Sequence, residues 1–303
     1  MTGPFRLFPP LAMVAAVLTL TGCVGSAPLP EISTGTTVVD LTVAGEDRSY
    51  VVTRPAELEQ PVPLVIVLHG GFGDADYARD NYGWDELAER EGFVVAYPNG
   101  IARAWAAGNG CCGRPGASGT DDVAFLTAVV DDISARVGID ESRVFATGMS
   151  NGGMMAYRLA CETGRFAGIA PVAATILGEC ENPGPISVLH IHGGADKSVR
   201  PDGEAGSGVE NIDGWPIAEV NELWRTTAGC DPPVVTVDGF VRTSTAECPN
   251  GRVVELLTVA GAGHQWPGSV YTPLQERLGV DPPSTALDAT ATIWEFFESL
   301  HKR

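Results

Sequence analysis

The residues best suited to chemistry in this chain surround Ser150. An apolar stretch, 144–146, runs into the motif Gly148-Met149-Ser150-Asn151-Gly152, and the residues after it are typical of a helix. A serine on a tight turn between a strand and a helix has a strained backbone, which glycine neighbours accommodate and which exposes the hydroxyl. We therefore predict that Ser150 is a nucleophile. The alternative is an incidental serine in a glycine-rich turn.

A serine nucleophile needs a base, and His264 is the favoured one. It lies in the irregular loop 261–268, which follows the apolar strand 253–259. Hydrolases with this serine turn place their base in such a loop, after the serine and the acid in chain order. The remaining histidines lie at a strand end, within a strand or in the C-terminal tail: His69, His190, His192 and His301.

Asp196 is the favoured acid. The apolar strand 186–191 runs into His192-Gly193-Gly194-Ala195-Asp196, between Ser150 and His264 in the chain. A buried carboxylate there would hold the imidazole tautomer and stabilise the imidazolium that forms during the reaction. The other carboxylates of the interval lie in a glycine-rich polar stretch that is typical of a surface loop: Asp202, Glu204, Glu210 and Asp213.

Two backbone N–H groups should form an oxyanion hole beside the serine. One is expected from Asn151, which directly follows Ser150. The other should come from the loop after the first long apolar strand, His69-Gly70-Gly71-Phe72-Gly73. We select Gly71, with its neighbours Gly70 and Phe72 as alternatives.

A metal site is the competing interpretation of His190, His192 and Asp196, because two histidines on one strand face can share a metal ion. The sequence offers no further grouping that completes a hydrolytic metal site, and only His69 and His264 remain as distant candidates. We therefore expect no metal and no other cofactor. The paired histidines would then pack beside the floor of the active site.

The N-terminus resembles an export signal. Its apolar run, 11–20, is too short to cross a bilayer as a mature helix and ends in Leu20-Thr21-Gly22-Cys23, which resembles a bacterial lipobox. Residues 1–22 are thus predicted to be a lipoprotein signal peptide, Cys23 the lipidated residue and 23–35 a flexible tether. The protein would be extracytoplasmic and anchored to the cell membrane by its lipid or, in the alternative, simply secreted.

The cysteines agree with an oxidising compartment, because six remain besides Cys23 and an even number can pair. Cys230 and Cys248 flank an expected strand pair and are predicted to form one disulfide. The other four allow either a bridge between sequence neighbours plus one more, or two crossing bridges: Cys111, Cys112, Cys161 and Cys180.

Composition and pattern predict one large catalytic domain, 36–303. Apolar residues make up 44 % of the chain, which is ample for a core, and the formal charge of −19 argues against nucleic acid as a partner. Apolar strands alternate with helices, which predicts an α/β fold with a mostly parallel central sheet, flanking helices and a site at the C-terminal strand ends. The expected helices are 84–91, 121–137 with Thr120 as its cap, 218–227 and 285–300.

Several segments resemble the secreted polyhydroxybutyrate depolymerase and feruloyl/acetylxylan esterase family of α/β-hydrolases. The resemblance covers nearly all of the chain from about residue 36, and relatives often carry cysteine where Gly71 stands, which leaves its N–H in place. It implies a serine esterase with Ser150 as nucleophile, His264 as base and Asp196 as orienting acid. The segments are Leu68-His69-Gly70-Gly71, 148–153, 192–196, Gly263-His264-Gln265-Trp266-Pro267-Gly268, and Trp105 ahead of Cys111-Cys112-Gly113 and 120–123.

The resemblance implies carboxylic esters as substrates, cleaved through an acyl-enzyme: feruloyl or acetyl esters of a polysaccharide, or hydroxyalkanoate oligomers. No insertion resembling a large lid and no appended binding module is evident in the sequence. Trp105 and Trp266 could stack on a feruloyl ring or a sugar, or could instead pack inside the domain. The alternative functions are a serine peptidase on the same fold and a non-catalytic surface-binding lipoprotein.

Overall fold

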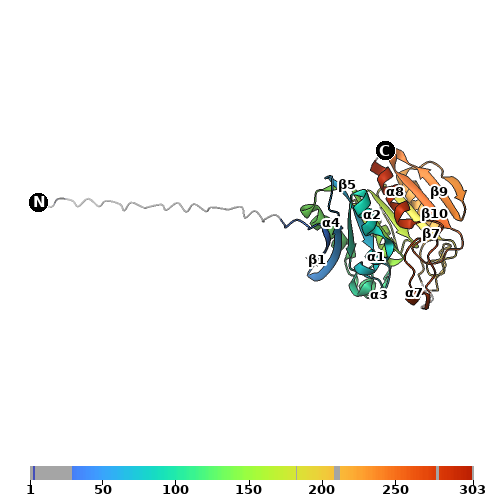
Figure 1. Cartoon of the computed structure of the whole chain (residues 1–303), viewed down its shortest axis with the longest axis horizontal. Helices are drawn as coiled ribbons and strands as arrows, with labels where there is room; N and C mark the ends of the chain where they lie inside the picture. Colours follow the sequence, from blue (N-terminus) through green and yellow to red (C-terminus); the bar gives the residue numbers. More distant parts are fainter. Residues whose placement is uncertain (1–2, 4–28, 182, 208–211, 278–279, 302–303) are drawn as a thin grey trace.

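The computed structural model describes residue 3 and residues 29–181, 183–207, 212–277 and 280–301. Apart from residue 3, the predicted signal peptide lies outside these described residues, as does Cys23. At the centre of the domain lies a ten-stranded sheet in the order β1-β2-β4-β3-β5-β6-β7-β10-β9-β8 (Figure 1). The strands are β1 Gly35–Val43, β2 Glu46–Arg54, β3 Val62–Leu68, β4 Val94–Pro98, β5 Ile139–Met149, β6 Gly168–Val172, β7 Ser187–Gly193, β8 Val234–Asp238, β9 Val241–Glu247 and β10 Val253–Val259.

The middle of the sheet is parallel and its two edges are antiparallel. Strands β4, β3, β5, β6, β7 and β10 run in one direction, whereas β1–β2 and β8–β9 add hairpins at the edges. β3 is buried at every residue and reads as a continuous apolar run, as expected for a parallel strand that is covered on both faces. The predicted α/β-hydrolase architecture is confirmed.

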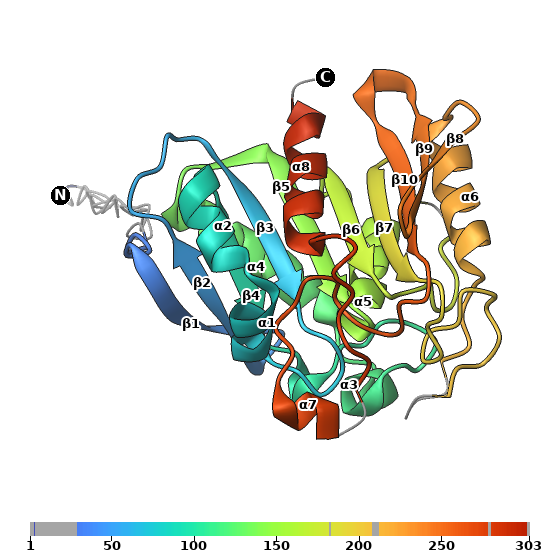
Figure 2. The ribbon, with the colours of Figure 1, turned by 45° about the vertical axis from the view of Figure 1, so that its right-hand side comes forward.

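Two layers of helices cover the sheet. On one face lie α4 (Asp122–Arg136), α5 (Asn151–Glu162) and α6 (Ile217–Ala228); on the other lie α1 (Ala75–Tyr82), α2 (Trp84–Glu91) and α8 (Ala289–His301) (Figure 2). Within the described ranges, no helix has both the length and the apolar character needed to cross a bilayer.

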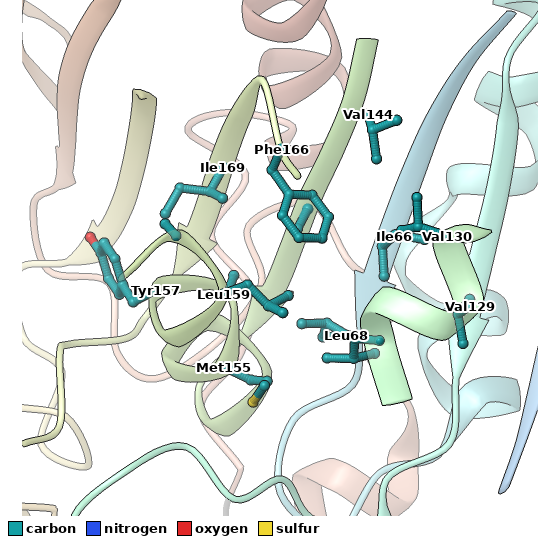
Figure 3. Packing of buried hydrophobic residues seen from close by; sticks show 14 of the residues in the cluster. Ile66, Leu68, Val129, Val130, Val144, Met155, Tyr157, Leu159, Phe166 and Ile169 are labelled. Atoms are coloured by element: carbon teal, nitrogen blue, oxygen red, sulfur yellow. The ribbon is translucent and has the colours of Figure 1, made fainter. Parts of the chain in front are cut away.

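The central strand β3 contributes to both cores. Leu64, Ile66 and Leu68 pack under the first layer, and Val65 and Val67 under the second. This division follows from the two-residue period of a strand, whose successive side chains point to opposite faces. Figure 3 shows the first core, where Ile66 and Leu68 lie between side chains of α4 and α5.

Four loops at one edge of the sheet carry the predicted site residues. Because parallel strands end at the same edge, the loops after β3, β5, β7 and β10 meet there. In that order they carry residues 69–73, Ser150, Asp196 and His264. The short helices α3 (Gly113–Ser118) and α7 (Pro273–Arg277) lie at the same edge (Figure 2).

Six cysteines of the described residues form three disulfides. The Cys230–Cys248 disulfide joins the segments after α6 and β9, as predicted. For the other four, the structure selects the arrangement with a bridge between sequence neighbours over the two crossing bridges. These pairs are Cys111–Cys112 and Cys161–Cys180.

The prediction of Thr120 as a helix cap is wrong by one residue. α4 begins at Asp122, and the carboxylate of Asp121 accepts the N–H of Ala124 at 2.9 Å. The Thr120 hydroxyl instead bonds to that of Ser118 at 2.9 Å. An aspartate at this position satisfies a free N–H and places negative charge at the positive end of the helix dipole, which favours the observed cap.

The folded domain begins before the predicted boundary at residue 36. Ile32 is 2 % exposed and belongs to the first core, and the carboxylate of Glu31 accepts a hydrogen bond from Arg54 at 2.8 Å. The last residues of the predicted tether therefore pack on the domain. At the other end, the final helix begins at Ala289 rather than at residue 285.

A buried ion pair holds the long loop between β4 and α4. Arg48 of β2 lies 2.7 Å from Asp122, with both side chains almost completely buried. The other carboxylate oxygen of Asp122 accepts the N–H of Ala106 at 2.8 Å, and Arg48 also donates to the carbonyl of Asn99 at 3.3 Å. The loop backbone is thus fixed at Asn99 and at Ala106 by the two charged side chains. A buried charge needs such hydrogen-bond partners, so these contacts are strongly favoured.

Candidate active site

Ser150 lies between β5 and α5 in a backbone conformation that L-residues rarely adopt, with φ +53° and ψ −120°. Such strain costs about 1–3 kcal/mol and persists only where the surroundings enforce it. Here the N–H of Ser150 donates to the carbonyl of Val172 at 2.9 Å. A Cβ on Gly152 would collide with the carbonyls of Leu68 and His69, so only glycine allows the helix to approach β3 this closely.

The side chains of Ser150, His264 and Asp196 form a continuous hydrogen-bonded chain. His264 Nε2 lies 2.9 Å from Ser150 Oγ, and its Nδ1 lies 2.8 Å from Asp196 Oδ2. A carboxylate can only accept, so the network places the proton on Nδ1 and leaves a lone pair on Nε2 to accept the serine hydroxyl. In this arrangement an imidazole can remove the proton of a serine.

Asp196 is held in its ionised form. Its side chain is fully buried, and its Oδ1 accepts the N–H groups of Ser198 at 2.8 Å and Val199 at 2.9 Å. Burial alone raises the pKa of this carboxyl, but hydrogen bonding and charge interactions with His264, together with His192 and the Val199 N–H, outweigh it. The pKa of Asp196 therefore lies below its ordinary value.

Asp281 fixes the loop that carries His264. Its Oδ2 accepts the N–H of His264 at 2.7 Å. Gly263 permits this contact, because a Cβ there would collide with the Asp281 carboxylate. The sequence did not single out Asp281, since nothing local links it to a loop 17 residues earlier.

His190 and His192 do not form the alternative metal cluster. Both are buried on β7, and His190 Nε2 lies 2.9 Å from His192 Nδ1, so these nitrogens bind each other. Among the described residues, no group of three or more His, Cys, Asp or Glu side chains is arranged to hold a metal ion.

Two backbone N–H groups are available beside Ser150. Asn151 begins α5, and the first N–H groups of a helix have no partner within it. In the part of the chain that the structure describes, the N–H of the exposed Gly71 makes no hydrogen bond. A Cβ built on Gly71 would lie 3.9 Å from that of Asn151. The alternative donor Phe72 is occupied, because its N–H binds the carbonyl of Arg103 at 2.8 Å.

Trp105 is fully buried, so the structure favours the second interpretation of this residue, packing inside the domain, over stacking on substrate. The side-chain amide of Asn151 accepts the Trp105 N–H at 2.7 Å and donates to the Trp105 carbonyl at 3.0 Å. The indole N–H donates to the carbonyl of His69 at 2.9 Å. Trp105 thereby links the start of α5 to the loop that carries Gly71.

Trp266 is also buried, at 1 % exposure, which again favours packing inside the domain over stacking on substrate. Its ring stacks on Tyr82 with the centroids 4.4 Å apart, and its indole N–H donates to Thr290 Oγ1 at 3.1 Å. The residue therefore anchors the His264 loop on α1 and α8.

His69 is held neutral beneath the loop of Gly71. The N–H of Gly100 donates to its Nε2 at 3.0 Å, so the network places the proton on Nδ1, which donates to the Gly70 carbonyl at 2.8 Å. Burial lowers the pKa of His69 to about 4. A neutral ring in this tautomer fixes the backbone one residue before Gly71.

The side chain of Phe72 is exposed in the loop after β3, which the sequence did not indicate. Its backbone has φ +66°, and the residue is 66 % exposed. Both properties are unfavourable for phenylalanine. Phe72 directly follows Gly71 in the loop that would bind a substrate carbonyl.

Known proteins similar to this chain are esterases. The family model described as esterase PHB depolymerase matches residues 48–203. NocK of Nocardia uniformis subsp. tsuyamanensis, provisionally named an esterase, is 35 % identical over 269 residues, which cover 80 % of this chain and 77 % of that protein. Feruloyl esterase C of Emericella nidulans is 29 % identical over 265 residues, covering 82 % of this chain and 83 % of that protein.

The fold is also that of solved esterases. Acetyl xylan esterase from Aspergillus awamori superposes with a TM-score of 0.59 at 15 % identity, covering 80 % of this chain and 98 % of that one. At this identity the likeness concerns the fold alone, whereas the family model and the relatives in sequence identify the kind of enzyme. The chain is a carboxylic-ester hydrolase that belongs to the esterase PHB depolymerase family.

Proposed function

We propose that the protein is an extracytoplasmic serine esterase that works through an acyl-enzyme on Ser150. The observation that carries the proposal is the series of two hydrogen bonds that links Ser150 to His264 at 2.9 Å and His264 to Asp196 at 2.8 Å. The free N–H groups of Gly71 and Asn151 supply the second requirement of acyl transfer, which is stabilisation of an oxyanion.

In acylation, Ser150 Oγ attacks the ester carbonyl while His264 Nε2 takes its proton. The carbonyl oxygen becomes an oxyanion that accepts hydrogen bonds from Gly71 and Asn151. When the tetrahedral intermediate collapses, the C–O bond to the alcohol breaks and His264 returns the proton to the leaving alkoxide. Water then attacks the acyl-enzyme by the same steps and releases the acid.

Asp196 acts through His264. Its carboxylate keeps the proton of the neutral ring on Nδ1 and faces the positive charge that develops when Nε2 is protonated. Because its pKa is lowered, Asp196 keeps its charge over the pH range in which an imidazole can serve as a base.

The proposed substrates are feruloyl or acetyl esters of a polysaccharide, or hydroxyalkanoate oligomers. The name of one relative in sequence, feruloyl esterase C, supports a feruloyl acyl group. Phe72 supports an aromatic acyl group, because it directly follows Gly71 in the chain and its exposed ring is an apolar surface on which such a group would stack.

The proposed location is outside the cytoplasm with a lipid on Cys23. Support comes from the lipobox-like segment Leu20-Thr21-Gly22-Cys23 and from three disulfides, which persist in oxidising compartments.

We expect Ser150→Ala to lower the kcat for p-nitrophenyl acetate, methyl ferulate and a 3-hydroxybutyrate oligomer at least about 1,000-fold, because the nucleophile is lost. Ser142→Ala, which removes an exposed hydroxyl on β5, is the matched control and should keep full activity. A fluorophosphonate probe should label the control but not Ser150→Ala. Ester hydrolysis that survives in Ser150→Ala would rule out the proposed mechanism.

We expect Phe72→Ala to raise the KM for methyl ferulate about 10-fold, since the stacking surface for the aromatic acyl group is removed. The KM for p-nitrophenyl acetate, whose acyl group is small, should change less. Phe240→Ala is the control, because Phe240 is 70 % exposed at the β8–β9 turn. Equal KM values for Phe72→Ala and Phe240→Ala with methyl ferulate would exclude Phe72 from substrate binding.

We expect Cys23→Ala to move the protein from the membrane fraction to the soluble extracytoplasmic fraction when the full chain is produced in bacteria. The reason is that the proposed lipid on this residue would hold the protein at the membrane. Immunoblots of washed membranes, periplasm and medium measure the distribution. Wild-type protein found mainly in the medium would favour ordinary secretion instead.

His69 should make the fold sensitive to acid. Its pKa is lowered from 6.5 to about 4 in the folded state, so between these values the unfolded chain binds more protons. The contribution of His69 to the free energy of unfolding is therefore complete above pH 6.5. It falls by up to about 3 kcal/mol as the pH drops to about 4.

We expect His69→Gln to flatten this pH dependence, because glutamine does not titrate there. Its free energy of unfolding at pH 7, from urea denaturation, should be lower than that of the wild type. Between pH 6.5 and 4 it should then fall less steeply. Identical slopes in the two proteins would show that His69 is not the group responsible.

A further inference from the structure

A line of buried polar groups runs from α5 to Asp196 and has no part in acyl transfer as described above. The Tyr157 hydroxyl lies 2.9 Å from His190 Nδ1, and His190 Nε2 lies 2.9 Å from His192 Nδ1. His192 Nε2 in turn lies 2.9 Å from the carbonyl of Val199. The three side chains are at most 1 % exposed, so water does not compete for these bonds.

The hydrogen bonds of this line can point in only one direction. A carbonyl is an acceptor, so His192 Nε2 carries a proton and donates to Val199. His192 Nδ1 must then accept from His190 Nε2, and His190 Nδ1 must accept from the Tyr157 hydroxyl. Every ring nitrogen is satisfied, with both imidazoles neutral.

The line ends at the carboxylate of the proposed triad. His192 Nε2 lies 3.5 Å from Asp196 Oδ2, the oxygen that also binds His264 Nδ1. Val199, which accepts from His192, donates its own N–H to Asp196 Oδ1 at 2.9 Å. The Nε2–H group of His192 therefore has two effects. It fixes Val199, which binds Asp196 Oδ1, and it brings positive charge density near Asp196 Oδ2.

The neutral state of His190 and His192 matters for this role. Burial and the neighbouring His192 lower the pKa of His190 well below its ordinary value. They outweigh a hydrogen bond with the Ala174 backbone, which raises this pKa. Burial also lowers the pKa of His192, despite Asp196 and the Val199 carbonyl. A charged His192 would compete with His264 for Asp196, and this competition is avoided.

We propose that Tyr157, His190 and His192 are positioning residues that set the hydrogen bonding of Asp196 and, through it, the orientation of His264. The proposal rests on the serine esterase mechanism proposed above and adds three residues that touch neither substrate nor reacting atoms. The Val199 carbonyl fixes the direction of the line, and Tyr157 completes it: without the tyrosine hydroxyl, the buried Nδ1 of His190 has no donor to accept from, and the His190 ring is no longer held in place. The change at His190 reaches His192 through the hydrogen bond between the two rings, and from His192 it reaches Val199 and Asp196.

The kinetic test is Tyr157→Phe, which removes one oxygen and keeps the ring. We expect its kcat to fall about fivefold, the effect of roughly one lost hydrogen bond, with an unchanged KM. Tyr97→Phe is the matched control, because Tyr97 is equally buried and donates to Asp85 at 2.7 Å, away from the triad. Its kcat should stay at the wild-type value even though it also loses a buried hydrogen bond.

The KM and the kcat show whether Tyr157→Phe acts by disturbing Asp196 or by disturbing a ligand bound elsewhere. Tyr157 also lines a cavity of about 290 Å³ beside the Cys161 end of α5, which the triad residues do not line. A raised KM with unchanged kcat would mean that Tyr157 acts through a ligand in this cavity, and would overturn the proposal. An equal kcat for Tyr157→Phe, Tyr97→Phe and wild type would overturn it too.

The spectroscopic test needs no turnover and therefore stands apart from the esterase mechanism. Nitrogen-15 NMR of the histidine rings in the wild-type protein should give the Nε2–H tautomer for His190 and His192, and Nδ1–H for neutral His264. In Tyr157→Phe the His192 signals and the low-field proton between His264 and Asp196 should shift, but not in Tyr97→Phe. An Nδ1–H tautomer at His192 would overturn the proposal, whereas activity that survives in Ser150→Ala would refute the mechanism and leave the tautomers unaffected.

Discussion

Two buried hydrogen bonds join the side-chain amide of Asn151 to the backbone of Trp105, and the rest of the site depends on them. Residues 98–121 contain little regular secondary structure, and buried peptide groups without partners would cost too much free energy. Side chains from two helices and from the loop after β3 supply those partners: Asn151 to Trp105, Asp122 to Ala106, and His69 to Gly100. The same contacts fix the turn of Ser150 against the loop of Gly71.

The histidines divide into two groups by burial and by partner. His69, His190 and His192 are buried, and their nitrogens bond to backbone groups, to each other or to a tyrosine. His264 alone among these four is partly exposed, at 19 % of its side chain, and faces both a hydroxyl and a carboxylate. Desolvation disfavours charge on the first group, whereas a buried carboxylate beside His264 favours the charge that forms during proton transfer.

The sequence predicted what depends on local pattern. Strand and helix periodicity, the glycines around Ser150 and the chain order of Asp196 and His264 were sufficient for the fold and for the members of the site. Burial is set by distant segments, so the pattern could not show that Trp105 and Trp266 lie inside the domain or that Phe72 lies outside. The six-residue helix α3 was missed because it has too few turns to display a period. Asp281 and Ile32 matter only through tertiary contacts.

The site is divided among four parallel strands, and this has a consequence for the time at which the protein becomes reactive. Ser150 and His264 are 114 residues apart in the chain, and Asp196 and His264 are 68 apart. Contacts between such distant segments form only after large loops have closed, and β10 precedes His264 as the last central strand to be synthesised. A chain that is still being made therefore contains Ser150 before His264 can reach it, and the proposed triad forms only when the domain is complete.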